Sequence, residues 1–345
     1  MTNPNTPPAL PPEAQMMQLL FGKIITFTLS GVAHVGVADH MGETPTSVED
    51  LAARTGSHAP SLYRAMRMLA SLGVFAEPQP RHFSLTPVGQ MLRSDAPNSM
   101  RQMAMMFSDP WITNAYQNIV HCLRTGGDGV TKAYGKHAFD LFKEIPDQAE
   151  RFHHAMTDLS TISGKALVEA YDFSRFQCIA DVGGGHGVIL GSILRATPGL
   201  RGVLYDLPEV VDGATPSGTL AGVEDRVSQQ SGSFFEAVPA GCDAYILKHI
   251  IHDWDDERAS RILSLMRAQL AAYPQGRVFL LEMVVPEGGE PAPAKMLDIE
   301  MLVATLGGKE RTEAEFRELF LSAGLEFERI TPTKSPMCLI EARVA

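Results

Sequence analysis

Two groups of residues carry the chemistry that this sequence could support, and the first is a glycine-rich turn. Residues 178–182 form a short apolar run, and Gly183, Gly185 and Gly187 then alternate before an apolar segment with helical spacing. This order predicts a strand, a tight turn and a helix. A dinucleotide site has its third glycine one position later, where this sequence has Val188, so the spacing disfavours NAD.

An acidic residue, Asp206, ends the next apolar run, at residues 202–206. It lies about twenty residues beyond the glycines, where a carboxylate at the tip of the second strand can accept hydrogen bonds from both ribose hydroxyls. The turn also lacks the Lys-Ser/Thr pair of a triphosphate site. These features predict an adenosine ligand without a triphosphate, of which S-adenosylmethionine is the commonest. The alternative is an ordinary α/β turn whose glycines serve packing alone.

The second group follows two later apolar runs. Lys248, His252 and Asp253 come just after the run at 244–247, so we expect them at the carboxyl edge of a sheet, where α/β proteins bind ligands. Glu282 stands inside an apolar run, where an unpaired charge costs several kcal/mol, so it requires a partner. Glu310 lies in a glycine turn before a predicted helix, and its alternative interpretation is a solvated loop acid.

A histidine with neighbouring carboxylates suits the removal of a proton from a hydroxyl. A phenol with a pKa of about 10 is a poor nucleophile at neutral pH, and an imidazole with a pKa of about 6.5 is a suitable base. His252 fits this role, and a carboxylate on its other ring nitrogen, from Glu282 or Glu310, would fix the tautomer. We expect Lys248 near the adenine or ribose, and Asp253 on the substrate hydroxyl or on backbone.

The elements that must position these groups alternate along the chain from residue 177 onward. Such alternation of apolar strands with helices is typical of a mostly parallel sheet covered on both faces, with ligands at the carboxyl ends of its strands. Helices are expected at 186–195, 255–270 and 312–323. Strands are expected at 178–182, 203–205, 226–229, 244–247, 278–285, 327–331 and 337–344.

The first third of the chain predicts a separate, smaller domain. Residues 1–12 are rich in Pro, Asn and Thr and are predicted to be a disordered lead rather than a signal peptide. Residues 16–29 and 32–40 are apolar on all sides, so we expect them to pack against a second copy of the chain rather than to span a membrane. Helices at 47–54 and 59–73, followed by a small hairpin, predict a winged helix.

Composition and charge argue against several partners. The 345 residues carry a net charge of −11, and Arg64 and Arg67 are the only cations on the presumed recognition helix, so we favour dimerisation over DNA binding. His249 and His252 are too few for a metal site and lack the spacing of a two-histidine helix motif, so no metal is predicted. The four cysteines show no CxxC spacing and indicate buried free thiols in a reducing, cytoplasmic compartment.

Between residues 86 and 165 the chain is predicted to be helical and rich in methionine. Phe107, Trp111, Phe152 and Met156 in this stretch allow two interpretations. They belong to an apolar core, or they line an adaptable flat pocket for a planar aromatic ligand.

Six motifs stand at residues 181–187, 205–208, 231–235, 248–257, 282–286 and 307–312. Together they resemble the plant-caffeate-type family of S-adenosylmethionine-dependent O-methyltransferases, which also has bacterial members. Residues 132–135 and the winged-helix region match too, so the resemblance spans nearly the whole chain. It implies an α/β fold, with a Rossmann-like class I methyltransferase domain at 106–345 and an N-terminal helical, winged-helix dimerisation domain at 13–105.

The resemblance also implies roles for single residues. It makes His252 the catalytic base, with Glu282 and Glu310 as the acids that flank it. The family needs no metal and works as a homodimer whose N-terminal helices interlock. The cofactor-contact positions fall on Gly183, Asp206, Phe234 and Lys248, to which the glycine turn adds Gly185, and the substrate-contact positions fall on Phe152, Met156, Met301 and Thr305.

One position departs from the family pattern. Ser233 stands where the family usually has an aspartate that accepts from the adenine amino group. A hydroxyl can accept the same hydrogen bond but without charge assistance, so we expect the contact to be weaker by about 1 kcal/mol.

We therefore expect an enzyme that transfers a methyl group from S-adenosylmethionine to a hydroxyl of an aromatic small molecule, phenolic or polyketide-like. Two other functions stay open: a winged-helix regulator that senses an adenosine ligand, and a relative that keeps the cofactor but performs another reaction. Sequence-specific DNA binding would favour the regulator. His252 with both acids favours methyl transfer, because proton removal needs them.

Overall fold

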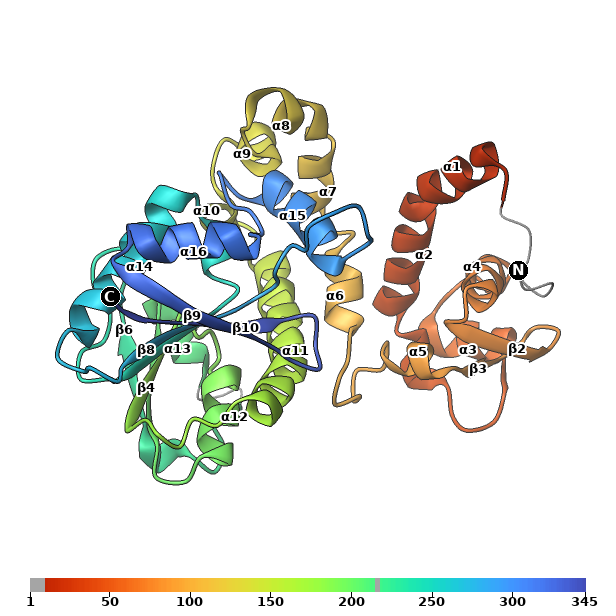
Figure 1. Ribbon diagram of the computed structural model, residues 1–345. Coiled ribbons are helices and arrows are strands. Elements are labelled where there is room, and N and C mark those ends of the chain that lie inside the picture. The colour runs from red at the N-terminus through yellow and green to blue at the C-terminus, as the bar shows by residue number, and fades with distance from the viewer. Residues whose placement is uncertain (1–9, 215–217) are drawn as a thin grey trace, which may run out of the picture. The chain divides into compact units, whose positions relative to one another are not determined.

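The computed structural model describes residues 10–214 and 218–345, and the chain divides into two compact units, Met1–Asp109 and Pro110–Ala345. Figure 1 shows their elements, coloured along the chain. Ser108 still belongs to the first unit, where its hydroxyl lies 2.5 Å from that of Ser30, so the division falls later than the boundary expected at 105–106. Of the lead predicted at 1–12, residues 1–9 lie outside the described residues, and Pro12 already begins a helix.

The first unit contains two apolar helices, followed along the chain by the predicted winged helix. Its small sheet has the order β1-β3-β2, and α3 and α4 pack beside it. Ser47 caps α3, because its hydroxyl accepts the backbone N–H of Asp50. The elements are α1 (Pro12–Leu20), α2 (Gly22–Val35), η1 (Val37–His40), β1 (Thr46–Ser47), α3 (Val48–Thr55), α4 (Ala59–Ser71), β2 (Phe75–Gln79), β3 (His82–Leu85), α5 (Pro87–Gln90) and α6 (Arg101–Met106).

Large apolar side chains on α1 and α2 are exposed. Leu19 is 76% exposed, Leu20 63% and Ile24 54%. Pro12–Val35 is the one stretch of the described chain that is long and apolar enough to cross a membrane by length and composition, which alone is weak evidence for a span. Exposed apolar surface of this kind is also typical of an interface between proteins.

A seven-stranded sheet forms the centre of the second unit. Its order is β6-β5-β4-β7-β8-β10-β9, with the first five strands parallel and β10 antiparallel to both neighbours. β4, β7 and β8 are buried along their whole length, which explains their continuous apolar sequences. The strands are β4 (Cys178–Val182), β5 (Arg201–Asp206), β6 (Val227–Ser231), β7 (Ala244–Lys248), β8 (Arg277–Glu282), β9 (Leu325–Pro332) and β10 (Cys338–Val344).

Helices cover both faces of this sheet, so the predicted α/β class is confirmed. One face packs on α11 (Pro146–Ala170) and α12 (Val188–Ala196), and the other on α14 (Asp256–Leu270) and α16 (Glu313–Ser322). A further group of helices contact one another beyond the sheet (Figure 1): α7 (Pro110–Tyr116), α8 (Ile119–Thr125), α9 (Gly129–Tyr134), α10 (Ala138–Phe142) and α15 (Pro293–Ala304). The connections include α13 (Pro208–Ala214), η2 (Glu224–Arg226) and η3 (Ile251–Asp253).

The sheet brings the predicted site residues to one edge. Because β5, β4, β7 and β8 are parallel neighbours, their carboxyl ends meet there. Gly183 follows β4, Asp206 ends β5, Lys248 ends β7 and Glu282 ends β8. β8 thus ends earlier than the predicted residue 285, because its pairing with β7 stops at Leu281.

Candidate active site

The turn after β4 depends on glycine. Gly183 and Gly185 have φ angles of 69° and 57°, in the left-handed region that other residues rarely adopt. A Cβ on Gly183 would lie 2.5 Å from Cδ1 of Ile250, so this contact packs the loop after β7 directly against the turn. A Cβ on Gly185 would meet no atom of the described residues within 4 Å, so this position borders open space.

Asp206 is oriented by the backbone of the same turn. Its Oδ2 accepts the N–H of Gly185 at 2.8 Å, and its Oδ1 accepts the N–H of Leu207 at 2.7 Å. A carboxylate has about four lone-pair sites, so each oxygen keeps room for a ligand hydroxyl. Burial raises the pKa of Asp206. The open space beside Gly185 and this fixed acceptor fit a nucleoside such as that of S-adenosylmethionine.

Phe234 and Ser233 lie beside the turn. Cε1 of Phe234 would be 3.6 Å from a Cβ on Gly183, and its ring packs against that of Phe235 with centroids 5.0 Å apart. Oγ of Ser233 accepts the N–H of Phe235 at 3.3 Å, so this hydroxyl is already engaged by its own loop. It keeps its proton and a second lone pair for a ligand.

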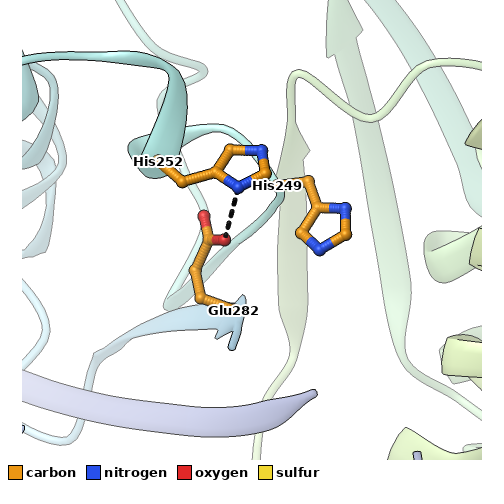
Figure 2. Close-up of side chains that lie close together, drawn as sticks. All are labelled: His249, His252 and Glu282. Atoms are coloured by element: carbon orange, nitrogen blue, oxygen red, sulfur yellow. Dashed lines mark ion pairs between the residues drawn. The ribbon is translucent and has the colours of Figure 1, made fainter. Parts of the chain in front are cut away.

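His252 lies in η3, just after β7, and is 6% exposed. Its Nδ1 lies 2.5 Å from Oε1 of Glu310 and 3.8 Å from Oε2 of Glu282. Its Nε2 lies 3.6 Å from Oδ1 of Asp253. Figure 2 shows His252 and Glu282 pointing toward one another from the loop and from the end of β8. The structure therefore brings together the four residues for which the sequence predicts catalysis.

Both glutamates are buried and held through backbone groups. Oε1 of Glu282 accepts the N–H groups of Ile250 and Ile251, each at 3.1 Å. The N–H of Glu310 donates to Oδ1 of Asp298 at 2.9 Å. The second oxygens, Oε2 of Glu282 and Oε2 of Glu310, have no hydrogen-bond partner among the described residues. The carboxyl group of Glu282 is thus held by two N–H groups and the backbone of Glu310 by Asp298, while one oxygen of each carboxyl group accepts no hydrogen bond from the described residues.

Burial dominates the electrostatics of this cluster. It raises the pKa of Glu282 to about 7, of Glu310 to about 8 and of Asp253 to about 6. It lowers the pKa of Lys248 to about 8, against the opposing attraction of Glu282. Buried groups that titrate near neutrality are typical of sites that exchange protons.

His249, His252 and Glu282 place donor atoms within 4.8 Å of one another, which raises the question of a metal site. The rings of His249 and His252 are stacked, with centroids 4.6 Å apart and an interplanar angle of 18°. An imidazole nitrogen binds a metal along a lone pair in its ring plane, at about 2.0–2.1 Å for zinc. Two nearly parallel ring planes share no such point, so in this arrangement both rings cannot hold one ion.

The predicted substrate residues fall into different surroundings. Trp111 is 3% exposed and packs edge-on against Phe142 and Phe152, with centroids 5.1 and 6.1 Å away. Trp111 is thus buried, whereas Phe152 is only partly buried. Phe107 lies in the first unit and is 41% exposed.

Thr305 and Met301 lie next to the loop of His252. Oγ1 of Thr305 donates to the carbonyl of Met301 at 2.8 Å, which closes the end of α15. A Cβ on Gly308 would lie 2.2 Å from Oγ1 of Thr305 and 2.4 Å from the carbonyl oxygen of His252. The absence of a side chain at Gly308 thus lets Thr305 lie close to the backbone of His252.

Two residues that the sequence analysis does not single out also hold the site. Arg311, 1% exposed, donates to the carbonyls of Ile251 and Trp254 at 3.1 and 3.0 Å and clamps the loop that carries His252. Asp298 holds the backbone of Glu310. A signal existed for Asp298, because it is one of two acids, with Glu300, in the largely apolar stretch 296–304.

Two family models match the chain. Residues 17–95 match an O-methyltransferase dimerisation domain, and residues 116–326 match an O-methyltransferase domain. The first match covers the end of α1 and all of α2, with the exposed Leu19, Leu20 and Ile24, and supports a homodimer. The second covers most of the unit that contains the site.

Known proteins resemble the chain over nearly its whole length. It is 39% identical over 343 residues to phenazine O-methyltransferase PhzM of Lysobacter antibioticus, which covers 99% of both chains. The crystal structure of LaPhzM matches with a TM-score of 0.90 at 39% identity, over 97% of this chain and 100% of that one. An O-methyltransferase from neocarzinostatin biosynthesis, solved with S-adenosylmethionine and 2-hydroxy-5-methyl naphthoic acid, matches with a TM-score of 0.76 at 29% identity, over 93% and 96%. The chain belongs to the S-adenosylmethionine-dependent O-methyltransferase family.

Proposed function

We propose that this enzyme methylates a hydroxyl of a flat aromatic small molecule, with His252 as general base and without a metal. One observation carries the proposal. Ile250 packs on Gly183 of the nucleoside turn, and two residues later His252 stands in η3 with Glu310 on its Nδ1. The base and the turn that would bind the methyl donor are thus parts of one packed cluster.

His252 has the partners of a base that accepts a proton at Nε2. A proton on Nδ1, donated to Oε1 of Glu310, selects the tautomer whose Nε2 is unprotonated. Once Nε2 has taken the hydroxyl proton, the carboxyl oxygens of Glu310 and Glu282, 2.5 and 3.8 Å from Nδ1, stabilise the imidazolium. Asp253 lies 3.6 Å from Nε2 and would orient the hydroxyl there.

S-adenosylmethionine supplies a methyl group on a positively charged sulfur. Asp206 would accept from its ribose hydroxyls, and Phe234 would pack on the adenine. Because the hydroxyl of Ser233 is shared with the N–H of Phe235, its bond to the adenine amino group should be weak. The proposed cofactor residues are Gly183, Gly185, Asp206, Ser233, Phe234 and Lys248.

The acceptor is proposed to be an aromatic ring, phenolic or polyketide-like. Phe152 and Met156 lie one turn apart on α11 and are partly buried, and Thr305 lies beside the loop of His252. The relatives named above act on, or are solved with, flat ring systems, a phenazine and a naphthoic acid. The proposed acceptor residues of the second unit are Phe152, Met156, Met301 and Thr305, with Trp111 packed against Phe152.

We also propose a metal-independent homodimer in the cytoplasm that binds neither nucleic acid nor membrane. The stacked rings of His249 and His252 favour metal independence. Leu19, Leu20 and Ile24 would lie in the interface with the second copy. The four cysteines are free thiols, which suits a reducing compartment. The net charge of −11 disfavours phosphate binding.

The test is incubation with labelled S-adenosylmethionine and a panel of phenols, naphthols and hydroxyphenazines, followed by mass analysis. We expect a product heavier by one methyl group, unchanged turnover after treatment with a chelator, and a loss of about 10²–10⁴-fold in His252→Ala with the affinity for S-adenosylhomocysteine intact.

The matched control is His58→Ala, which removes an exposed histidine of the first unit whose ring bonds Ser61. Full activity of His252→Ala would refute the base assignment. Loss of turnover with the chelator, restored by a divalent ion, would refute metal independence. Salt-dependent, sequence-specific DNA binding without methyl transfer would favour the regulator instead.

A further inference from the structure

His249 is a partly buried histidine that the proposed proton transfer does not use. It follows β7 directly and has a φ angle of 53°, one of two positive values outside glycine in the described chain. Such a backbone persists only where the surroundings hold it, and strained residues of this kind cluster at functional sites. Histidine is among the few residue types that tolerate it.

The ring of His249 is wedged between two side chains of the second unit. On one side it stacks on His252, with centroids 4.6 Å apart and planes 18° apart. On the other, its Nε2 lies 3.0 Å from Sδ of Met337, a residue 2% exposed. Its backbone N–H donates to the carbonyl of Leu281 at 3.4 Å. In Figure 2 the ring of His252 stands above the carboxylate of Glu282, and the ring of His249 stands to the right of both.

We propose that His249 is a positioning residue: its ring packs flat against His252 and fixes the plane in which the base presents Nε2. The proposal rests on the proposed role of His252. The bond from Nδ1 to Glu310 holds one edge of the imidazole but leaves its face without support. The stacked ring of His249 supports that face and so favours the ring plane in which Nε2 points toward the acceptor.

The backbone of His249 contributes separately. The left-handed residue turns the chain so that the next two N–H groups, of Ile250 and Ile251, both reach Oε1 of Glu282 at 3.1 Å. Successive N–H groups after such a turn form an anion-binding nest. The same residue therefore orients Glu282 through its backbone and His252 through its ring.

The charged groups around His249 favour a neutral ring, which can stay stacked on His252 when His252 is protonated. The charged and titratable groups around it are Lys248, His252 and Glu282. Burial, Lys248 and His252 hold the pKa of His249 well below its usual range, so the ring stays neutral when His252 takes a proton. A second imidazolium in the stack would repel the first.

Two substitutions separate ring from backbone. His249→Asn keeps a residue that tolerates the left-handed region but removes the ring, and His249→Phe keeps a ring that never ionises. With a phenol accepted by the wild type, we expect kcat of His249→Asn to fall about tenfold with both KM values within about twofold. His249→Phe should stay within about threefold of wild type.

Full kcat in His249→Asn would overturn the proposal, and so would an equal loss of kcat in a folded His249→Phe. Phenylalanine adopts the left-handed region less readily than histidine, so thermal melting checks whether His249→Phe is folded.

If His249→Phe does not fold, a resonance experiment tests the proposal without any acceptor. It records nuclear magnetic resonance of histidine labelled at Cε1, with S-adenosylhomocysteine bound. We expect the His249 signal of the wild type to stay constant between about pH 5.5 and 8.5, and the His252 signal to move in His249→Asn through lost ring current. The proposed stacking is refuted if the His249 signal of the wild type titrates in this pH range, or if the His252 signal does not move in His249→Asn.

The two proposals fail separately. If His252→Ala remains active, His252 is not the base, while the resonance result on the stack still stands.

Discussion

Replacing Glu310 by glutamine would remove a charge from the base while keeping the shape of the side chain. Oε1 of Glu310 lies 2.5 Å from Nδ1 of His252 and is buried with it. An amide donates as well as accepts, so the new side chain can turn its NH2 group toward Nδ1. The ring proton then sits on Nε2, where it blocks proton uptake from a hydroxyl. Glu310→Gln therefore weakens the imidazolium and favours the wrong tautomer.

The size of the effect follows from these two losses. A hydrogen bond to a charged group contributes about 1.5–3 kcal/mol, which is roughly 10- to 150-fold in rate at 1.36 kcal/mol per tenfold. Tautomer error adds about a further tenfold, while Glu282, at 3.8 Å from Nδ1, keeps part of the charge in place. We expect kcat to fall about 10²–10³-fold and the dissociation constant of S-adenosylhomocysteine to change less than about threefold.

Single-turnover methyl transfer from labelled donor measures the first quantity, and calorimetric titration measures the second. The control is Glu318→Gln, the same change at an exposed position of α16. In the double variant with His252→Ala we expect no loss beyond that of His252→Ala, because a partner acts only through its base. Near-wild-type turnover in Glu310→Gln, or additive losses in the double variant, would refute the assigned partnership.

Three further outcomes test the other parts of the site. Asp206→Ala should weaken S-adenosylhomocysteine binding about 10- to 100-fold in a calorimetric titration, because two charge-assisted ribose contacts are lost. Gly183→Ala should lower both cofactor affinity and melting temperature, because its Cβ would lie 2.5 Å from Cδ1 of Ile250 at a φ of 69°. Burial raises the pKa of Glu282 from 4.5 to about 7, so the folded protein holds a proton that the unfolded chain releases in this window. As the pH rises from 4.5 to about 7, the melting temperature of the wild type should therefore fall relative to that of Glu282→Gln. Melting temperatures of the two proteins that change in parallel with pH would contradict the raised pKa.

The sequence predicted the sheet because its signals are local. The run at 178–182 is apolar at every position but the buried Asp181, and glycines follow it, so its predicted bounds match β4. The edge of the sheet follows from the same signals, since parallel strands must present their carboxyl ends together. α15 was missed because its residues 293–304 are apolar on several sides and lack a polar cap.

The contacts that orient the base could not be predicted in the same way. Asp298 and Arg311 act through backbone groups of other segments, so no spacing in the sequence pairs them with their partners. The positive φ of His249 has no signal either, because nothing in its neighbouring residues demands a left-handed turn. Trp111 shows a different limit of sequence-based prediction. An aromatic residue at helical spacing gives the same sequence pattern whether it packs in a core or lines a pocket.

The carboxyl groups of Glu282 and Glu310 beside His252 suit the movement of positive charge during methyl transfer. One positive charge enters the site on sulfur and ends as the proton on His252, so the buried cluster must accommodate a cation throughout. Glu282 and Glu310 provide the acidic surroundings: burial raises their pKa values to about 7 and about 8, and the attraction of His252 opposes this rise at Glu282. A cation beside them lowers these pKa values, so negative charge develops when the imidazolium forms.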